Sequence, residues 1–132
     1  MLFLWLRGGV ADYRSLEVWK RAYDLTLKVY RITQAYPNNE TFGLVAQTRR
    51  AMTSVSANIA EGSGRSSNRD YARFVAIAIG SSNEVECELR LAKDLDYLGA
   101  EDWAWIEAEL SQIRSMLTRL RQHLLATPDR NS

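Results

Sequence analysis

RRAMTSVSANIAEGSGRSSNRDY, residues 49–71, is the stretch that decides the fold. It predicts the end of one helix, a tight glycine–serine turn and the start of a second helix. Gly62 is expected to end the first helix in the left-handed conformation, which glycine adopts at little cost. Ser67, followed by Asp70, resembles a capping box and predicts where the second helix begins. Two helices joined by so short a turn form an antiparallel hairpin.

Apolar residues at helical spacing extend this hairpin in both directions along the chain. The spacing predicts helices over about 15–35, 40–61, 67–98 and 101–126, with Ser15 capping the first of them and Pro37 following its end. The last helix carries a heptad seam, in which apolar residues step alternately by three and four: Trp103, Ile106, Leu110, Ile113, Leu117, Leu120 and Leu124. No run alternates with period two, so we expect no strand. The chain is therefore predicted to be an all-α, antiparallel up-down four-helix bundle over residues 13–126.

Several residues on these helices are expected to pack in the core or in an interface between chains. Trp19, Tyr23 and Tyr30 share an apolar stripe of the first helix, which is more typical of packing than of a cofactor site. Leu110 and Leu117 lie on the heptad seam. Gly80 stands inside the third helix, where glycine costs about 1 kcal/mol relative to alanine, so we expect a neighbouring helix to approach closely there.

Composition limits the class of protein. The 132 residues are enough for one domain with its own core, and the net charge of +1 creates no global field toward nucleic acid or membrane. Cys87 is the only cysteine, which excludes an intrachain disulfide and favours a reducing, cytoplasmic location. The apolar start, residues 1–6, is shorter than a signal peptide or a membrane span requires. We expect a flexible arm over 1–12, a disordered tail over 127–132 and no membrane association.

The sequence resembles a known family. The resemblance rests on Leu16, Val18 and Trp19; on Gln47, the run Arg49-Arg50-Ala51, Ser54 and the run Asn58-Ile-Ala-Glu-Gly62; and on Arg65, Phe74, Gly80-Ser81, Glu84 and Leu89. Over residues 13–124 it is similar to the four-helix-bundle family of proteins encoded in intervening sequences of bacterial 23S ribosomal RNA genes. The accessory variability determinants of diversity-generating retroelements share this superfamily. The resemblance implies a bundle protomer that assembles into a homopentamer, with no known enzymatic activity.

Five arginines form the densest cationic cluster of the sequence: Arg49, Arg50, Arg65, Arg69 and Arg73. Arginine favours bidentate contact with phosphate or carboxylate, so the cluster could meet the backbone of RNA or DNA. The retroelement relatives are strongly basic and bind nucleic acid, whereas this chain is close to neutral. We favour salt bridges within or between chains, because Glu61 at the C-terminus of its helix needs a cationic partner. The acidic span 84–109 is expected to be a solvated face or to meet a basic surface of another subunit.

Catalytic and metal chemistry receive no support from the sequence. His123 is the only histidine, and the Glu-x-x-His pairs of di-iron bundles do not occur. We therefore expect no catalytic residues, no metal, no cofactor and no small-molecule substrate. The predicted function is a non-catalytic, self-assembling scaffold in the form of a ring-like homo-oligomer. The alternative is an accessory module that binds nucleic acid through the arginine cluster.

Overall fold

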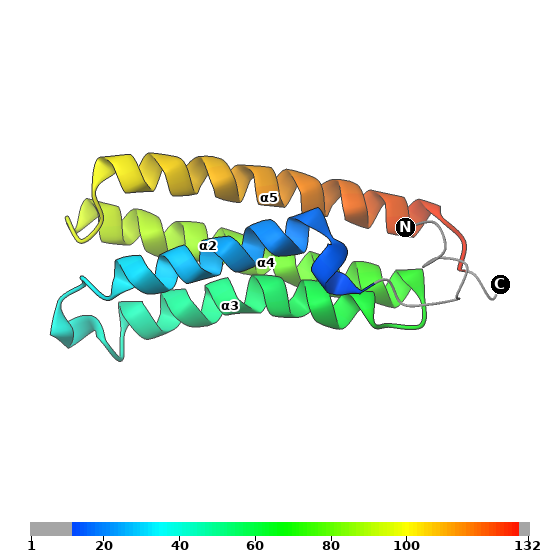
Figure 1. Ribbon diagram of the computed structural model, residues 1–132, viewed down its shortest axis with the longest axis horizontal. Coiled ribbons are helices and arrows are strands. Elements are labelled where there is room, and N and C mark those ends of the chain that lie inside the picture. The colour runs from blue at the N-terminus through cyan, green and yellow to red at the C-terminus, as the bar shows by residue number, and fades with distance from the viewer. Residues whose placement is uncertain (1–11, 130–132) are drawn as a thin grey trace.

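The computed structural model describes residues 12–129, and in this range the chain is all-α, with four long helices and no strand. The helices are α2 (Glu17–Thr33), α3 (Leu44–Ser63), α4 (Asn68–Asp94) and α5 (Ala100–Ala126). Two short 3₁₀ turns, η1 (Tyr13–Ser15) and η2 (Asn38–Glu40), precede α2 and α3. Each long helix runs antiparallel to the one before it (Figure 1). The prediction of an all-α chain with four helices is confirmed.

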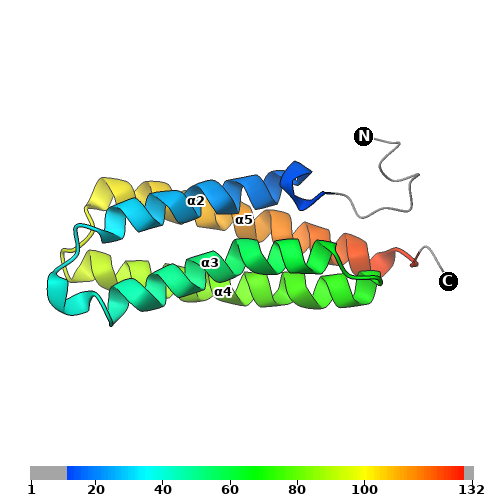
Figure 2. The same ribbon diagram turned by 60° about the horizontal axis from the view of Figure 1, so that its bottom comes forward.

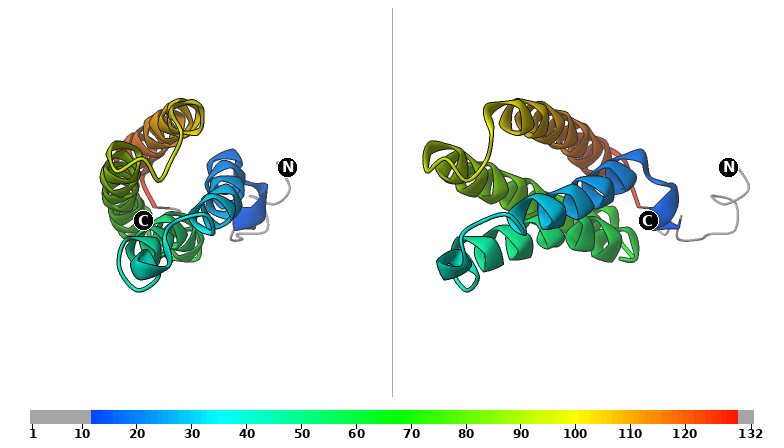
Figure 3. Two further views of the ribbon diagram at one scale, coloured as in Figure 1. Left: turned by 90° about the vertical axis from the view of Figure 1, so that its left-hand side faces the viewer. Right: turned by 60° about the vertical axis from the view of Figure 1, so that its left-hand side comes forward.

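The four helices pack with α2 and α4 at diagonal corners. Helix α2 lies beside α3 and α5, and α4 lies beside the same two helices, whereas the backbones of α2 and α4 do not approach each other closely. Figure 2 shows the α3–α4 hairpin as one layer, with α2 and α5 lying over it. The views along the bundle in Figure 3 place α2 and α4 on different sides of the molecule.

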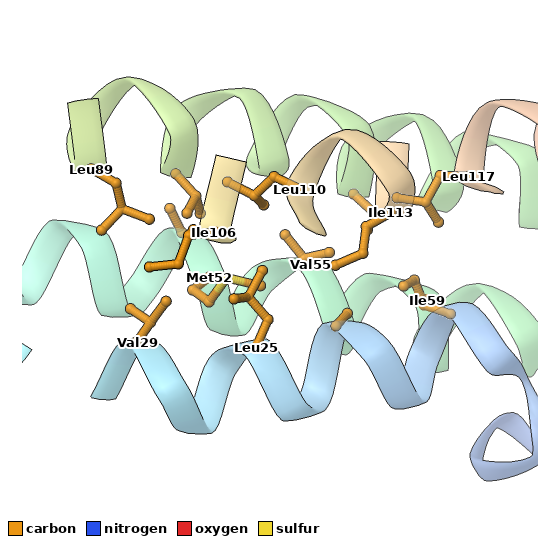
Figure 4. Packing of buried hydrophobic residues seen from close by; sticks show 14 of the residues in the cluster. Leu25, Val29, Met52, Val55, Ile59, Leu89, Ile106, Leu110, Ile113 and Leu117 are labelled. Carbon is orange, nitrogen blue, oxygen red and sulfur yellow. The ribbon is translucent and has the colours of Figure 1, made fainter. Parts of the chain in front are cut away.

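The core is built from one apolar stripe of each helix. The seam of α5 is buried from Trp103 to Leu117, while Leu120 is only partly buried. Leu110 and Leu117 are fully buried and face side chains of α2 and α3, including Leu25 and Val55 (Figure 4). A continuous seam of this kind excludes water along the whole length of the bundle, which stabilises it through the hydrophobic effect.

The first two helices begin later than the sequence predicts. Helix α2 begins at Glu17, because Asp12 caps η1 by accepting a hydrogen bond from the Arg14 N–H, and Ser15 lies within that turn. Helix α3 begins at Leu44 rather than near Glu40, because η2 occupies residues 38–40. The Glu40 carboxylate instead accepts a hydrogen bond from the Leu44 N–H at 3.3 Å, so it helps to satisfy the start of α3 from outside the helix.

Helix α4 begins where the sequence predicts and ends earlier. The Ser67 hydroxyl accepts a hydrogen bond from the Asp70 N–H at 3.0 Å, which confirms Ser67 as the N-cap. The helix ends at Asp94, short of the expected end at Leu98. Asp96 has a φ of 63°, a left-handed conformation that stops the helix before the chain turns toward α5.

Gly62 and Gly80 have roles that differ from the predicted ones. Gly62 does not end α3 in the left-handed conformation, since it lies inside the helix, and the C-cap is Gly64 with a φ of −89°. A Cβ on Gly62 would lie 2.8 Å from Cδ1 of Tyr71 and 2.9 Å from Cβ of Phe74. A Cβ on Gly80 would meet no heavy atom within 4 Å. The close approach between helices therefore occurs at Gly62, where α3 meets α4.

The chain ends lie largely beyond residues 12–129. Of the expected flexible arm over 1–12, the structure describes only Asp12. Of the expected disordered tail over 127–132, it describes three residues, and two of them bond to Asn68 at the start of α4. The Asn68 side chain donates to the Thr127 carbonyl, and its backbone N–H donates to the Asp129 carboxylate. No helix within 12–129 is long and apolar enough to cross a membrane.

Candidate functional site

The five arginines that are close in sequence form two separate groups in space. Arg49 and Arg50 lie in the first half of α3, while Arg65 follows its end and Arg69 and Arg73 lie at the start of α4. A helix rises about 1.5 Å per residue, so the two groups are roughly 20 Å apart along α3. No single ligand group can contact all five arginines of one chain.

Arg49 joins α3 to the last turn of α2. Its Nε donates to the Thr33 hydroxyl at 2.9 Å, and its Nη2 donates to the Tyr30 carbonyl at 3.1 Å. The guanidinium also lies over the Tyr30 ring, 4.6 Å from the centroid. A cation at the carbonyl end of a helix is favourable, so these contacts account for Arg49 within its own chain.

Arg65 and Arg73 share an acidic and an aromatic partner. Their Nε atoms lie 3.6 Å and 2.9 Å from carboxylate oxygens of Asp70. Each guanidinium also lies 4.5 Å from the centroid of the Phe74 ring. Arg65 is the arginine partner expected for Glu61, at a distance of 3.8 Å. Because these side chains are largely exposed, such pairs contribute little stability individually.

Arg50 and Arg69 are exposed, and neither forms an ion pair within residues 12–129. Arg69 and Arg73 line one pocket together with Arg121 and Leu125 of α5. Arg121 is absent from the sequence candidates, because it lies far from them along the chain and only the α4–α5 pairing brings it close. The pocket therefore brings three arginines together, and Asp70, which pairs with Arg73, also lines it.

The acidic span 84–109 is mostly paired within the chain. Glu86 accepts a hydrogen bond from Arg114 at 2.7 Å, and Glu107 one from Arg90 at 3.2 Å, which join α4 to α5. Arg21 donates from its Nε and Nη2 to the two carboxylate oxygens of Glu109, each at 3.0 Å. This pair joins α2 to α5. Asp102 lies 3.6 Å from Lys28. Within 12–129, no group of three or more His, Cys, Asp or Glu side chains is placed to hold a metal ion.

Glu88 is the one acid of this span that is buried, and sequence reasoning missed it. Its side chain is 9% exposed, and its Oε1 has no hydrogen-bond partner within the described residues. Burial raises the pKa of Glu88 to about 7; the nearby Glu84 carboxylate acts in the same direction and Arg50 opposes it. The available signal was position, because Glu88 lies between Val85 and Leu89 on the apolar stripe of α4.

Asn58 holds a polar contact between α3 and α4. Its amide nitrogen donates to the Ser54 carbonyl at 2.8 Å and to the Ser54 hydroxyl at 2.9 Å. The Ser54 hydroxyl in turn lies 2.9 Å from that of Ser81. Asn58 therefore orients Ser54, which contacts Ser81 of α4, while Gly62 permits the close approach of the two helices.

Large apolar side chains are exposed singly at Phe42, before α3, and at Trp105 and Leu125 of α5, and in groups of three on α2 and α4. On α2, Tyr23, Leu27 and Tyr30 are exposed, and Trp19 stacks on Tyr23 with ring centroids 4.8 Å apart. On α4, the exposed side chains are Ile77, Leu91 and Leu95. Of the aromatic residues predicted to pack in a core or interface, Trp19 is half-buried, while Tyr23 and Tyr30 lie on the surface.

A comparison with solved structures shows the fold, and a family model shows the family. A solved structure of a protein of unknown function from the S23 ribosomal protein family of Bacteroides thetaiotaomicron has a similar fold, with a TM-score of 0.74. It is 24% identical in sequence, and the similarity covers 80% of this chain and 95% of that one. A search of curated proteins gives no match. The family model of the 23S rRNA-intervening sequence protein matches residues 14–119. The chain therefore belongs to the family of 23S rRNA-intervening sequence proteins.

Proposed function

We propose that this protein is a non-catalytic scaffold whose copies assemble into a ring-like homo-oligomer. The observation that carries the proposal is the exposed aromatic and aliphatic face of α2. Tyr23, Leu27 and Tyr30 are each at least 40% exposed on one helix. Contiguous apolar surface on a folded chain usually marks an interface, and aromatic residues are enriched in interface centres.

The contacts within the chain favour assembly over a lone bundle. The core of the monomer is already closed by the α5 seam, so it does not need the outer face of α2. Tyr23 and Tyr30 are held in place by Trp19 and Arg49, which limits the side-chain entropy that binding would cost. The family resemblance suggests five copies.

The test is the mass of the wild-type protein in solution. Sedimentation equilibrium at micromolar concentration should give a multiple of the 15.1 kDa chain mass, and five copies is the expected number. A mass of one chain over the whole concentration range would contradict self-assembly. A cytoplasmic location remains a prediction from the single cysteine.

A second candidate function is binding of RNA or DNA through the pocket at the α4–α5 junction. The observation that favours it is the convergence of Arg69, Arg73 and Arg121 on that pocket. Phosphate contacts release counterions, so binding should weaken steeply with salt. Arg69→Ala combined with Arg121→Ala should reduce both the affinity and the slope of this salt dependence. Binding that is unchanged in the double variant would exclude this pocket as the site.

A further inference from the structure

The outward face of α2 has an apolar centre and a mostly basic rim. Tyr23, Leu27 and Tyr30 share one side of the helix through their spacing. Lys20 and Arg31 are exposed on the same side, and neither forms an ion pair within residues 12–129. The edges of this face also carry Arg49, which lies over Tyr30, and the exposed carboxylates of Glu17 and Asp24. Three cations against two carboxylates leave the rim of this face slightly positive.

The outward face of α4 has an apolar centre and acidic neighbours. Ile77, Leu91 and Leu95 are exposed at a spacing that places them on one side of the helix. Glu84 lies between them, exposed and without an ion pair in the described part of the chain. Glu88 follows one turn later, with a buried oxygen that has no partner there. Two cations border this face as well: Arg50 of α3 offsets Glu88, and Arg73, one turn before Ile77, pairs with Asp70. The charge at the centre of the α4 face is therefore the Glu84 carboxylate, opposite in sign to Lys20 and Arg31 on α2.

Both faces adjoin α3, although α2 and α4 lie at diagonal corners. On the α2 side, Arg49 of α3 covers the Tyr30 ring. On the α4 side, Arg50 of α3 lies close enough to Glu88 to affect its ionisation. Two faces that both lean toward the same helix are inclined to each other rather than parallel. A contact between inclined, different faces rotates each copy relative to the last, and repeated contacts of this kind form a ring where the rotation closes on itself.

We propose that the α2 face of one copy packs head-to-tail on the α4 face of the next copy. This inference rests on the self-assembly proposed above. A second copy is the occupant because the chain itself supplies both halves of the match. If two α2 faces paired, Lys20 and Arg31 of one copy would face the cations of the other. If two α4 faces paired, Glu84 of one copy would face Glu84 of the other. Head-to-tail pairing places opposite charges around an apolar centre, which sets the register of the contact.

Two matched substitutions test the arrangement, with a third as the control. Leu27→Glu should block the α2 face, and Leu91→Glu the α4 face, and we expect each variant alone to sediment as a monomer. Leu125→Glu makes the same chemical change on α5 at a comparable exposure, 53%, and should leave the oligomer intact. Mixed in equal amounts, the Leu27→Glu and Leu91→Glu variants should form a dimer with one chain of each, because each retains the half that the other lacks. Circular dichroism of each variant checks that the helices are unchanged.

The outcomes separate this inference from self-assembly itself. A wild-type mass of three or more chains, with single variants that are monomeric and a mixture that dimerises, supports it. A wild-type dimer would mean that like faces meet, and a single variant that still assembles fully would mean that its substituted face is not part of the contact; either result would overturn the inference while leaving self-assembly in place. A mixture that stays monomeric would also overturn it. A monomeric wild type that assembles when residues 1–11 are deleted would overturn it too, because the arm would then occupy one of the faces.

Discussion

Replacing Gly62 by alanine should destabilise the chain, although alanine is the better helix former. The added Cβ would lie 2.8 Å from Cδ1 of Tyr71, 2.9 Å from Cβ of Phe74 and 3.2 Å from the Tyr71 carbonyl oxygen. Non-bonded carbon atoms prefer separations of about 3.5–4.0 Å. The Phe74 Cβ and the Tyr71 carbonyl are fixed to the α4 backbone, so rotation of a side chain cannot relieve the overlap. The two helices must instead move apart.

The magnitude follows from two opposing terms. Overpacking of a close contact costs about 1–3 kcal/mol, and the upper part of this range applies where backbone must shift. Replacing glycine by alanine inside a helix returns about 1 kcal/mol. We therefore expect Gly62→Ala to lower the free energy of unfolding by about 2 kcal/mol. Gly80→Ala has the same helical gain, and its added Cβ meets no heavy atom within 4 Å in its own chain. This substitution should therefore raise the free energy of unfolding by up to about 1 kcal/mol.

The assay is urea unfolding followed by circular dichroism at one fixed chain concentration, since assembly also contributes to apparent stability. Both glycine substitutions are compared in the wild type and in the Leu27→Glu background. Gly80 is exposed on α4, one turn after Ile77, so a loss of stability at Gly80 that appears only in the assembling wild type would place a second copy against it. If Gly62→Ala is as stable as the wild type in both backgrounds, the close approach of α3 and α4 is wrong.

Three further substitutions test the core, the buried acid and the inner arginine. Leu117→Ala should lower the free energy of unfolding by about 2–5 kcal/mol, and a loss below about 1 kcal/mol would mean that the seam is not buried. The pKa of Glu88 is raised from 4.5 to about 7 in the folded chain, so its contribution to stability is present below pH 4.5 and is lost as the pH rises through 7. Glu88→Gln should therefore match the wild type in stability at pH 4 and exceed it at pH 8, by roughly 1–3 kcal/mol; equal stabilities at both values would contradict the burial of its charge. Arg49→Ala should lower the free energy of unfolding by about 1–2 kcal/mol, whereas Arg69→Ala should change it by less than about 0.5 kcal/mol; similar losses would show that the contacts of Arg49 add nothing.

The features that sequence predicted well are those that depend on local chemistry. The heptad spacing of α5 predicts a continuous buried stripe, and a helix has no other way to place those residues. Ser67 caps α4 because its hydroxyl needs only the N–H of Asp70, three residues along the same chain. Such signals depend on residues within one or two turns, so a single sequence contains all of the information.

The features that sequence missed depend on a second helix. A glycine near a helix end is compatible both with a left-handed cap and with close packing, and only the position of Tyr71 and Phe74 decides between them at Gly62. Arg121 joins Arg69 only through the pairing of α4 with α5. Glu88 was counted with the surface acids, because its burial depends on how far α3 covers that flank of α4.

Polar contacts join neighbouring helices of the bundle along their flanks, whereas the outward faces of α2 and α4 carry exposed apolar side chains. Both flanks of α5 are tied by charged pairs, Arg21–Glu109 on the α2 side and Arg114–Glu86 on the α4 side. The flanks of α3 are tied by Arg49 to α2 and by the Ser54–Ser81 contact to α4. The largest clusters of exposed apolar side chains lie instead on the outward faces of α2 and α4. Because each of those helices has its polar anchors on its inner flanks, an added chain could cover the apolar faces without breaking any contact of the bundle.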